Sequence, residues 1–157
     1  MYKHFQMKKA FILFMVAMLP ILAVSCHKNQ EGSSMNGAVK NADNGTALQI
    51  TELSAKNTSE YGGSIYLTLS AKEGTVPIWL SMFISPDAKV GETLSFNNIH
   101  FGIPISSNSE DYTDEFTGRM TLAGKDSKSV SVEMKNTAFK IAHGTYTFDG
   151  TFVFGYK

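Results

Sequence analysis

The chain has almost no cysteine and no apolar run long enough to cross a membrane as a helix. Cys26 is the single cysteine among 157 residues, so no disulfide bond can form within the chain. The longest apolar run covers residues 10–24, which is shorter than the roughly 20 residues of a membrane-spanning helix. Pro20 interrupts that run and breaks its helical hydrogen bonding. These features argue against a disulfide-stapled fold and against a permanent transmembrane anchor.

Residue signatures of catalysis are missing as well. The sequence contains no G-x-S-x-G serine motif, no phosphate-binding loop and no dinucleotide-binding fingerprint. A zinc site is unsupported, because His100 and His143 are the only histidines after residue 27 and they form no H-x-H or H-E-x-x-H pair. We expect His143 in a turn and His100 on an exposed strand face. We therefore predict a protein without enzymatic activity and without a cofactor.

The charge balance depends on the N-terminal segment. Over the whole chain, 14 lysine and arginine residues balance 14 aspartate and glutamate residues. Lys3, Lys8 and Lys9 precede residue 26, so the remainder has 11 basic and 14 acidic residues and a net charge of −3. Nucleic-acid binding needs a basic patch, and attraction to anionic lipid needs a polybasic segment. We expect no nucleic-acid partner and no membrane attachment through charge.

The N-terminal segment has the three parts of an export signal. These are a basic start at Lys8 and Lys9, the apolar run, and a small residue, Ser25, at the cleavage position. The end of the segment, Leu22-Ala23-Val24-Ser25-Cys26, resembles the lipobox of bacterial lipoproteins in the relaxed form of the Bacteroidota. The resemblance implies that residues 1–25 are a signal peptide and that Cys26 carries fatty acyl chains such as palmitate. The alternative is an ordinary secretory signal with Cys26 unmodified.

Residues 26–45 are rich in Asn, Gly and Ser after the cysteine and have almost no large apolar side chain. Such a segment buries too little surface to order itself, so we predict a flexible tether followed by one folded domain over residues 46–157. In lipoproteins of this kind, aspartate directly after the cysteine implies retention at the inner membrane. His27 holds that place, so the resemblance implies the outer membrane and leaves its periplasmic and surface sides open.

From residue 46 onward, apolar side chains recur at every second position. This period is typical of strands with one buried face, whereas no stretch of ten or more residues has a 3.6-residue helical period. Gly- and Pro-containing turns separate the runs, which predicts an all-β domain of about nine antiparallel strands. The clearest runs are Leu48–Ile50, Ile65–Leu69, Ile78–Ile84 and Ile99–Ile105.

The C-terminal part has a pattern that predicts strand register. A two-residue turn at His143-Gly144 sets Phe139 opposite Phe148 and places the apolar side chains of both strands on one face. Residues 145–156 keep their aromatic side chains on one face only as a continuous strand with a bend or bulge at Gly150. We therefore predict a long, aromatic last strand at the centre of the core.

A second hairpin is predicted over residues 116–134. A turn at residues 125–127 sets Leu122 opposite Val130 on the inner face. The same register sets Arg119 opposite Glu133 on the outer face as a cross-strand charge pair.

The predicted strands favour an antiparallel two-sheet β-sandwich of immunoglobulin-like or related topology. A lipocalin-like β-barrel is the alternative. The pattern also resembles the small, uncharacterised all-β domains common on Bacteroidota lipoproteins, a resemblance that supplies no active-site residues.

One acidic segment is a candidate metal site. Glu110, Asp111, Asp114 and Glu115 lie within six residues, and oxygen ligands at this density can bind calcium. The segment lacks the residue order of a calcium-binding EF-hand, so a solvated loop between strands is the favoured interpretation. The alternative functions are a calcium-assisted or carboxylate-based hydrolase that uses this segment.

One aromatic pair is a candidate ligand-binding surface. Trp79 and Phe83 share a strand face opposite Leu80, and exposed aromatic rings bind sugar rings and other flat apolar surfaces. The apolar character of that strand favours the alternative, a strand covered on both faces. Overall the sequence predicts an outer-membrane lipoprotein with a non-catalytic binding or assembly module. Its partner would be a glycan or an envelope protein, and a lipocalin-like carrier is a further alternative.

Overall fold

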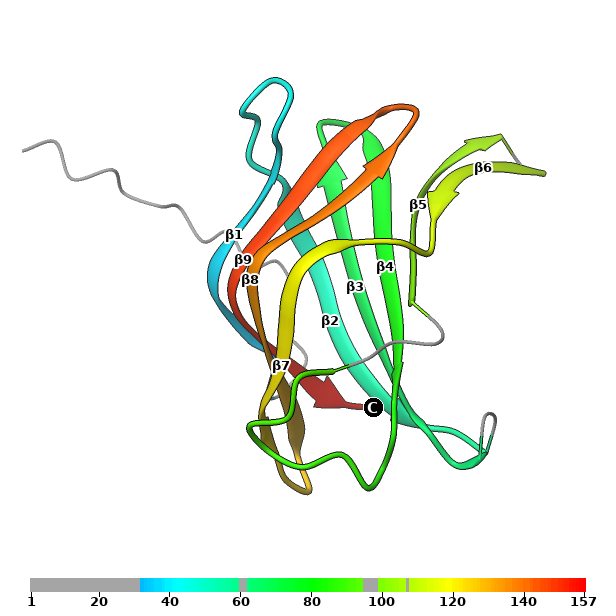
Figure 1. Cartoon of the computed structure of the whole chain (residues 1–157). Helices are drawn as coiled ribbons and strands as arrows, with labels where there is room; N and C mark the ends of the chain where they lie inside the picture. The colour runs from blue at the N-terminus through cyan, green and yellow to red at the C-terminus, as the bar shows by residue number, and fades with distance from the viewer. Residues whose placement is uncertain (1–31, 60–61, 95–98, 107) are drawn as a thin grey trace, which may run out of the picture.

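The computed structural model describes residues 32–59, 62–94, 99–106 and 108–157, and these residues form an all-β domain (Figure 1). Among them, no helix is long and apolar enough to span a membrane. The signal peptide, Cys26 and the start of the tether lie outside the described residues. The strands are β1 (Ser34–Asn41), β2 (Gln49–Asn57), β3 (Ile65–Glu73), β4 (Val76–Ile84), β5 (Ile99–Ser106), β6 (Ser109–Thr113), β7 (Thr117–Lys125), β8 (Ser129–Ile141) and β9 (Gly144–Tyr156).

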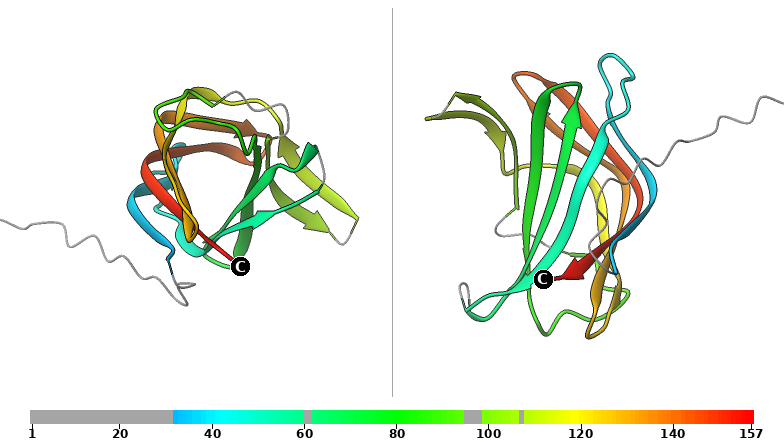
Figure 2. Two further views of the ribbon diagram at one scale, coloured as in Figure 1. Left: turned by 90° about the horizontal axis from the view of Figure 1, so that it is seen from below. Right: turned by 180° about the vertical axis from the view of Figure 1, so that it is seen from behind.

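All nine strands belong to one sheet, which curls into a partly barrel-like shape (Figure 2). The order along the sheet is β6-β5-β4-β3-β2-β9-β8-β7, and β1 also pairs with β9. All pairings are antiparallel except the short parallel contact between β2 and β9. The two-sheet sandwich is not confirmed, because the strands are continuous through β2 and β9 rather than divided into two layers.

The boundary predicted between tether and domain is wrong. β1 lies within the segment predicted to be flexible, and it pairs with β9 from Ser34↔Val153 to Asn41↔Tyr146. Ser33 is buried beside this strand, where its hydroxyl donates to the Leu53 carbonyl and accepts from the Gly155 amide. Main-chain pairing orders β1 despite its few apolar side chains, so the folded domain begins well before residue 46.

The alternating runs do form strands with one buried face. Buried and less buried positions alternate as predicted in β3. They also alternate in β4 and the first half of β5, except that the outer-face residues Ser81 and Gly102 are buried, and Ile105 is exposed. Aromatic rings fill the interior, where Phe101 stacks on Phe139 at 4.9 Å and contacts Tyr146 and Phe148. The predicted aromatic core around the last strand is therefore confirmed.

Both predicted hairpins exist, but each register is wrong by two residues. The first turn is Ala142-His143, so Phe139 pairs with Tyr146 rather than with Phe148. A shift of two residues keeps every side chain on the same face, so the burial pattern does not distinguish the two registers.

The second hairpin has Leu122 opposite Val132 rather than Val130, because its loop covers residues 126–129 and sets Lys125 opposite Val130. A bulge in β7 between residues 122 and 124 then changes the register by one residue. The turn of this hairpin is closed by Asp126, whose Oδ1 accepts hydrogen bonds from the Lys128 and Ser129 amides. The predicted Arg119–Glu133 pair is wrong, since Arg119 lies opposite Lys135.

The bend predicted at Gly150 lies where β9 is paired with β1 on one side and with β8 on the other. β9 continues through Gly150, which has a φ of +123° and pairs with Gly37 of β1. A Cβ atom on Gly150 would lie 2.4 Å from the Asn36 carbonyl oxygen. On the other side of β9, β8 bulges between Met134 and Thr137. Glycines and bulges at such positions let a twisted sheet curl on itself.

Candidate functional site

The strands β5 and β6 form a ribbon at one end of the sheet order, where β6 is the last strand (Figure 1). In this ribbon Gly102 lies opposite Tyr112 on one side and opposite Trp79 of β4 on the other. Residues that lie opposite each other in antiparallel strands point to the same face. The ribbon therefore brings Trp79 and Tyr112, which are far apart in sequence, to one outer face of the sheet.

A row of three rings crosses this face. The His100 ring stacks on Trp79 at 4.6 Å and lies 4.4 Å from the Tyr112 ring, measured between centroids. Gly102 lies beneath this row, and a Cβ atom there would be 3.1 Å from both the Trp79 ring and the Tyr112 Cβ. The absence of a side chain at residue 102 thus leaves room for the rings. Trp79 and His100 are half-buried, whereas Tyr112 is 54% exposed.

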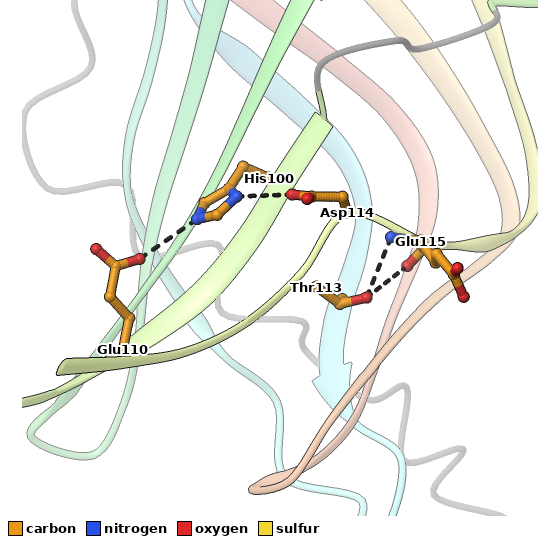
Figure 3. Close-up of polar contacts among 5 residues, drawn as sticks. All are labelled: His100, Glu110, Thr113, Asp114 and Glu115. Carbon is orange, nitrogen blue, oxygen red and sulfur yellow. Dashed lines mark hydrogen bonds and ion pairs between the residues drawn. The ribbon is translucent and has the colours of Figure 1, made fainter.

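Two carboxylates hold the imidazole from opposite sides (Figure 3). The Nδ1 atom of His100 lies 2.7 Å from the Asp114 Oδ1 atom, and its Nε2 atom lies 3.3 Å from the Glu110 Oε2 atom. Glu110, Tyr112 and Asp114 alternate along β6 and its end, so all three point to the outer face. The candidate site is this outer face, formed by Trp79, His100, Glu110, Tyr112 and Asp114, and we call it the β4–β6 face.

Asp111 points to the other side of β6 and fixes the ribbon to the rest of the domain. Its carboxylate accepts hydrogen bonds from the amides of Ala142 and His143 and lies 2.6 Å from the His143 Nδ1 atom. Burial raises the pKa of Asp111, but the hydrogen bonds from His143 and Ala142 outweigh it and hold the pKa below its usual value. These contacts connect β6 to the turn between β8 and β9.

We expect Asp111→Asn to loosen this attachment. Hydrogen bonds to a charged partner contribute about 1.5–3 kcal/mol, so the variant should lose about that much free energy of unfolding at neutral pH, measured by urea denaturation. Because folding lowers the pKa of Asp111, its contribution is present above about pH 4 and is lost as the pH falls through the folded-state pKa. The difference from wild type should therefore shrink below about pH 4.

The control for this prediction is Asp87→Asn, which changes an exposed carboxylate in the turn after β4 and should alter stability by less than about 0.5 kcal/mol. An equal loss in both variants, or a difference between wild type and Asp111→Asn that persists unchanged at about pH 2, would contradict the assigned role of Asp111.

The predicted calcium-binding segment does not converge on one point. Glu110 and Asp114 face His100, Asp111 faces His143, and the Glu115 carboxylate points away from His100 (Figure 3). Among the residues that the structure describes, no group of three or more His, Cys, Asp or Glu side chains is arranged to hold a metal ion.

Trp79 and Phe83, the aromatic pair predicted from the sequence, contact different neighbours in the structure. Trp79 and Phe83 both lie on the outer face and are half-buried, so β4 is not fully covered on both faces. Phe83 packs on Tyr66 of β3 at 4.7 Å, whereas Trp79 joins the row with His100 and Tyr112. Only Trp79 therefore belongs to the β4–β6 face.

Sequence reasoning missed His100 and Tyr112 as members of this face. A signal was present, because a hairpin between residues 99–106 and 109–113 sets Gly102 opposite Tyr112. The position of Trp79 in the same row depends on the pairing between β4 and β5, which the sequence pattern alone does not define.

Comparisons with protein families, with curated proteins and with solved structures found no match for this chain. The function of the protein must therefore be inferred from the chemistry of its own surfaces.

Proposed function

We propose that the protein is a non-catalytic binding module of the cell envelope, attached to the outer membrane by acyl chains on Cys26, and that the β4–β6 face is its ligand-binding surface. The observation that carries this proposal is the exposed ring of Tyr112 in a row with His100 and Trp79. Exposed aromatic rings beside hydrogen-bonding groups are typical of ligand-recognition surfaces.

The surface has the rigidity that recognition needs. Trp79 and His100 are on paired strands, their rings contact each other, and both nitrogens of His100 have a carboxylate partner. Asp111 holds the same ribbon from behind. Side chains fixed in this way lose little conformational freedom on binding, so more of the interaction energy remains as affinity.

Neither alternative function has comparable support. A carboxylate-based hydrolase needs two carboxyl groups across a cleft, and here Glu110 and Asp114 are on one open face with His100 between them. A lipocalin-like carrier needs space inside the barrel, whereas Phe101, Phe139 and Phe148 contact one another in the interior. A binding surface on the outside of the sheet requires neither arrangement.

Replacement of Tyr112 tests the proposal. We expect Tyr112→Ala to weaken binding to isolated cell-envelope fragments by about two- to tenfold, because stacking on one aromatic ring contributes about 0.5–1.5 kcal/mol. Binding is measured by co-sedimentation of the full chain carrying Cys26→Ala, so that acyl chains cannot mediate it.

The matched control is Ile105→Ala on the same ribbon, since Ile105 and Tyr112 are similarly exposed at 55% and 54%. Ile105→Ala should leave co-sedimentation unchanged. If the Cys26→Ala chain does not sediment with envelope fragments, or if Tyr112→Ala and Trp79→Ala bind as well as wild type, the proposed binding surface is wrong.

A further inference from the structure

We propose that the β4–β6 face binds a saccharide with a protonated amino group, its ring on Tyr112 and its ammonium group between Glu110 and Asp114. This inference rests on the proposed function and specifies the chemistry of its ligand. It is carried by the charge of the face and by the position of its exposed groups.

The charge of the face is negative in either protonation state of His100. Glu110 and Asp114 bring two negative charges, and His100 supplies at most one positive charge. In the described part of the chain, no lysine or arginine forms an ion pair with either carboxylate. An anionic ligand would be repelled, whereas a cationic ligand restores neutrality.

The carboxylates are placed to accept from a ligand. Their side chains are 49% and 65% exposed for Glu110 and Asp114, so both reach solvent. Each contacts His100 through one oxygen, Oε2 and Oδ1 respectively, which leaves Oε1 and Oδ2 available without breaking the contact with His100. An ammonium group carries three donors and can bond to such oxygens directly.

Tyr112 explains why the ligand should contain a ring as well as a charge. Tyr112 lies between Glu110 and Asp114 in the sequence, and its side chain points to the same face as their carboxylates. The Tyr112 ring contacts the His100 ring. β6 is the last strand of the sheet order, so none of the described strands lies beyond Tyr112 on that side. A pyranose ring can pack its C–H groups on the aromatic ring while its ammonium group donates to the carboxylates.

The test compares three oligosaccharides of equal length. They are an oligomer of glucosamine, the neutral oligomer of N-acetylglucosamine and the acidic oligomer of galacturonic acid. Binding to the purified protein is measured by isothermal titration calorimetry at about pH 6, where amino groups are protonated. We expect the glucosamine oligomer to bind at least about tenfold more tightly than the neutral oligomer, and the acidic oligomer not to bind. Added salt should weaken the glucosamine complex selectively.

Variants separate the two parts of the site. Glu110→Gln and Asp114→Asn should each lower the affinity for the glucosamine oligomer about tenfold and leave that for the neutral oligomer unchanged, whereas Tyr112→Ala should weaken both. Glu115→Gln is the matched control, because this carboxylate points away from His100 (Figure 3). A loss with Glu115→Gln equal to that with Glu110→Gln would show a general charge effect and overturn the site.

Further outcomes would overturn the inferred ligand, and they can be told apart from a failure of the proposed binding surface. Equal affinity for the glucosamine and neutral oligomers would remove the role of the ammonium group. Equal affinity for a lysine oligomer of the same charge would show that charge alone is recognised. If no oligosaccharide binds but Tyr112→Ala still weakens sedimentation with envelope fragments, the ligand class is wrong while the binding surface stands.

Discussion

Gly150→Ala should destabilise the protein by about 3 kcal/mol, since backbone strain and overpacking each contribute about 1–3 kcal/mol. Gly150 has a φ of +123°, a conformation that residues with a Cβ atom rarely adopt. The added Cβ would also lie 2.4 Å from the Asn36 carbonyl oxygen and from the Gly37 Cα atom. Both neighbours are main chain, so the strand pair β1–β9 would have to separate. Urea denaturation followed by intrinsic fluorescence measures the loss.

The control is Gly124→Ala in β7. A Cβ atom there would lie 3.5 Å from the Ser131 hydroxyl oxygen, which is ordinary van der Waals contact. We expect this variant to match the wild type within about 0.5 kcal/mol. If both glycine variants unfold at the same urea concentration as wild type, the close approach of β1 and β9 does not limit stability and the account of the bend is wrong.

Cys26→Ala should release the protein from the membrane fraction and abolish incorporation of a radiolabelled fatty acid. The part of the chain after residue 25 has a net charge of −3 and no polybasic segment, so it brings no electrostatic attraction to anionic lipid. Acyl chains on Cys26 would then supply the membrane affinity, at about 0.8 kcal/mol for each buried methylene group. Membrane fractionation and acyl labelling of the full chain in cells measure both effects.

Ser25→Ala is the matched control, because it keeps a small residue at the cleavage position and should preserve labelling and fractionation. Two results would contradict the lipoprotein proposal. One is a Cys26→Ala protein that stays in the membrane fraction, which would make the leader an anchor. The other is wild-type protein that takes up no label.

The buried faces of the strands could be predicted because alternation is a local property of the chain. Leu67 and Leu69 of β3, and Leu80 and Met82 of β4, are fully buried as the period of two indicates. The same property cannot define register, since pairing Phe139 with Tyr146 or with Phe148 buries the same residues. β1 was missed for a related reason: its pairing with β9 uses main-chain hydrogen bonds, which leave no apolar signature in the sequence.

Part of the candidate site could likewise be predicted from alternation along single strands, and part depended on how the strands pair. The outward position of His100 and the possible exposure of Trp79 followed from alternation within single strands. Their association with Tyr112 required the pairings of β4 with β5 and of β5 with β6, together with a glycine at residue 102. The acidic segment was identified as a unit, but alternation in β6 sends Asp111 to one side and Glu110 and Asp114 to the other.

The sequence by itself determined that this domain is all-β, which side chains it buries, and the negative charge of the part after residue 25. These follow from composition and from the two-residue period, and both are independent of how distant strands pair. Only the tertiary structure decided the single curled sheet, the membership of β1, and the meeting of Trp79, His100 and Tyr112 on one face. Those features depend on main-chain pairing between distant segments, and many registers satisfy the same pattern of apolar and polar residues.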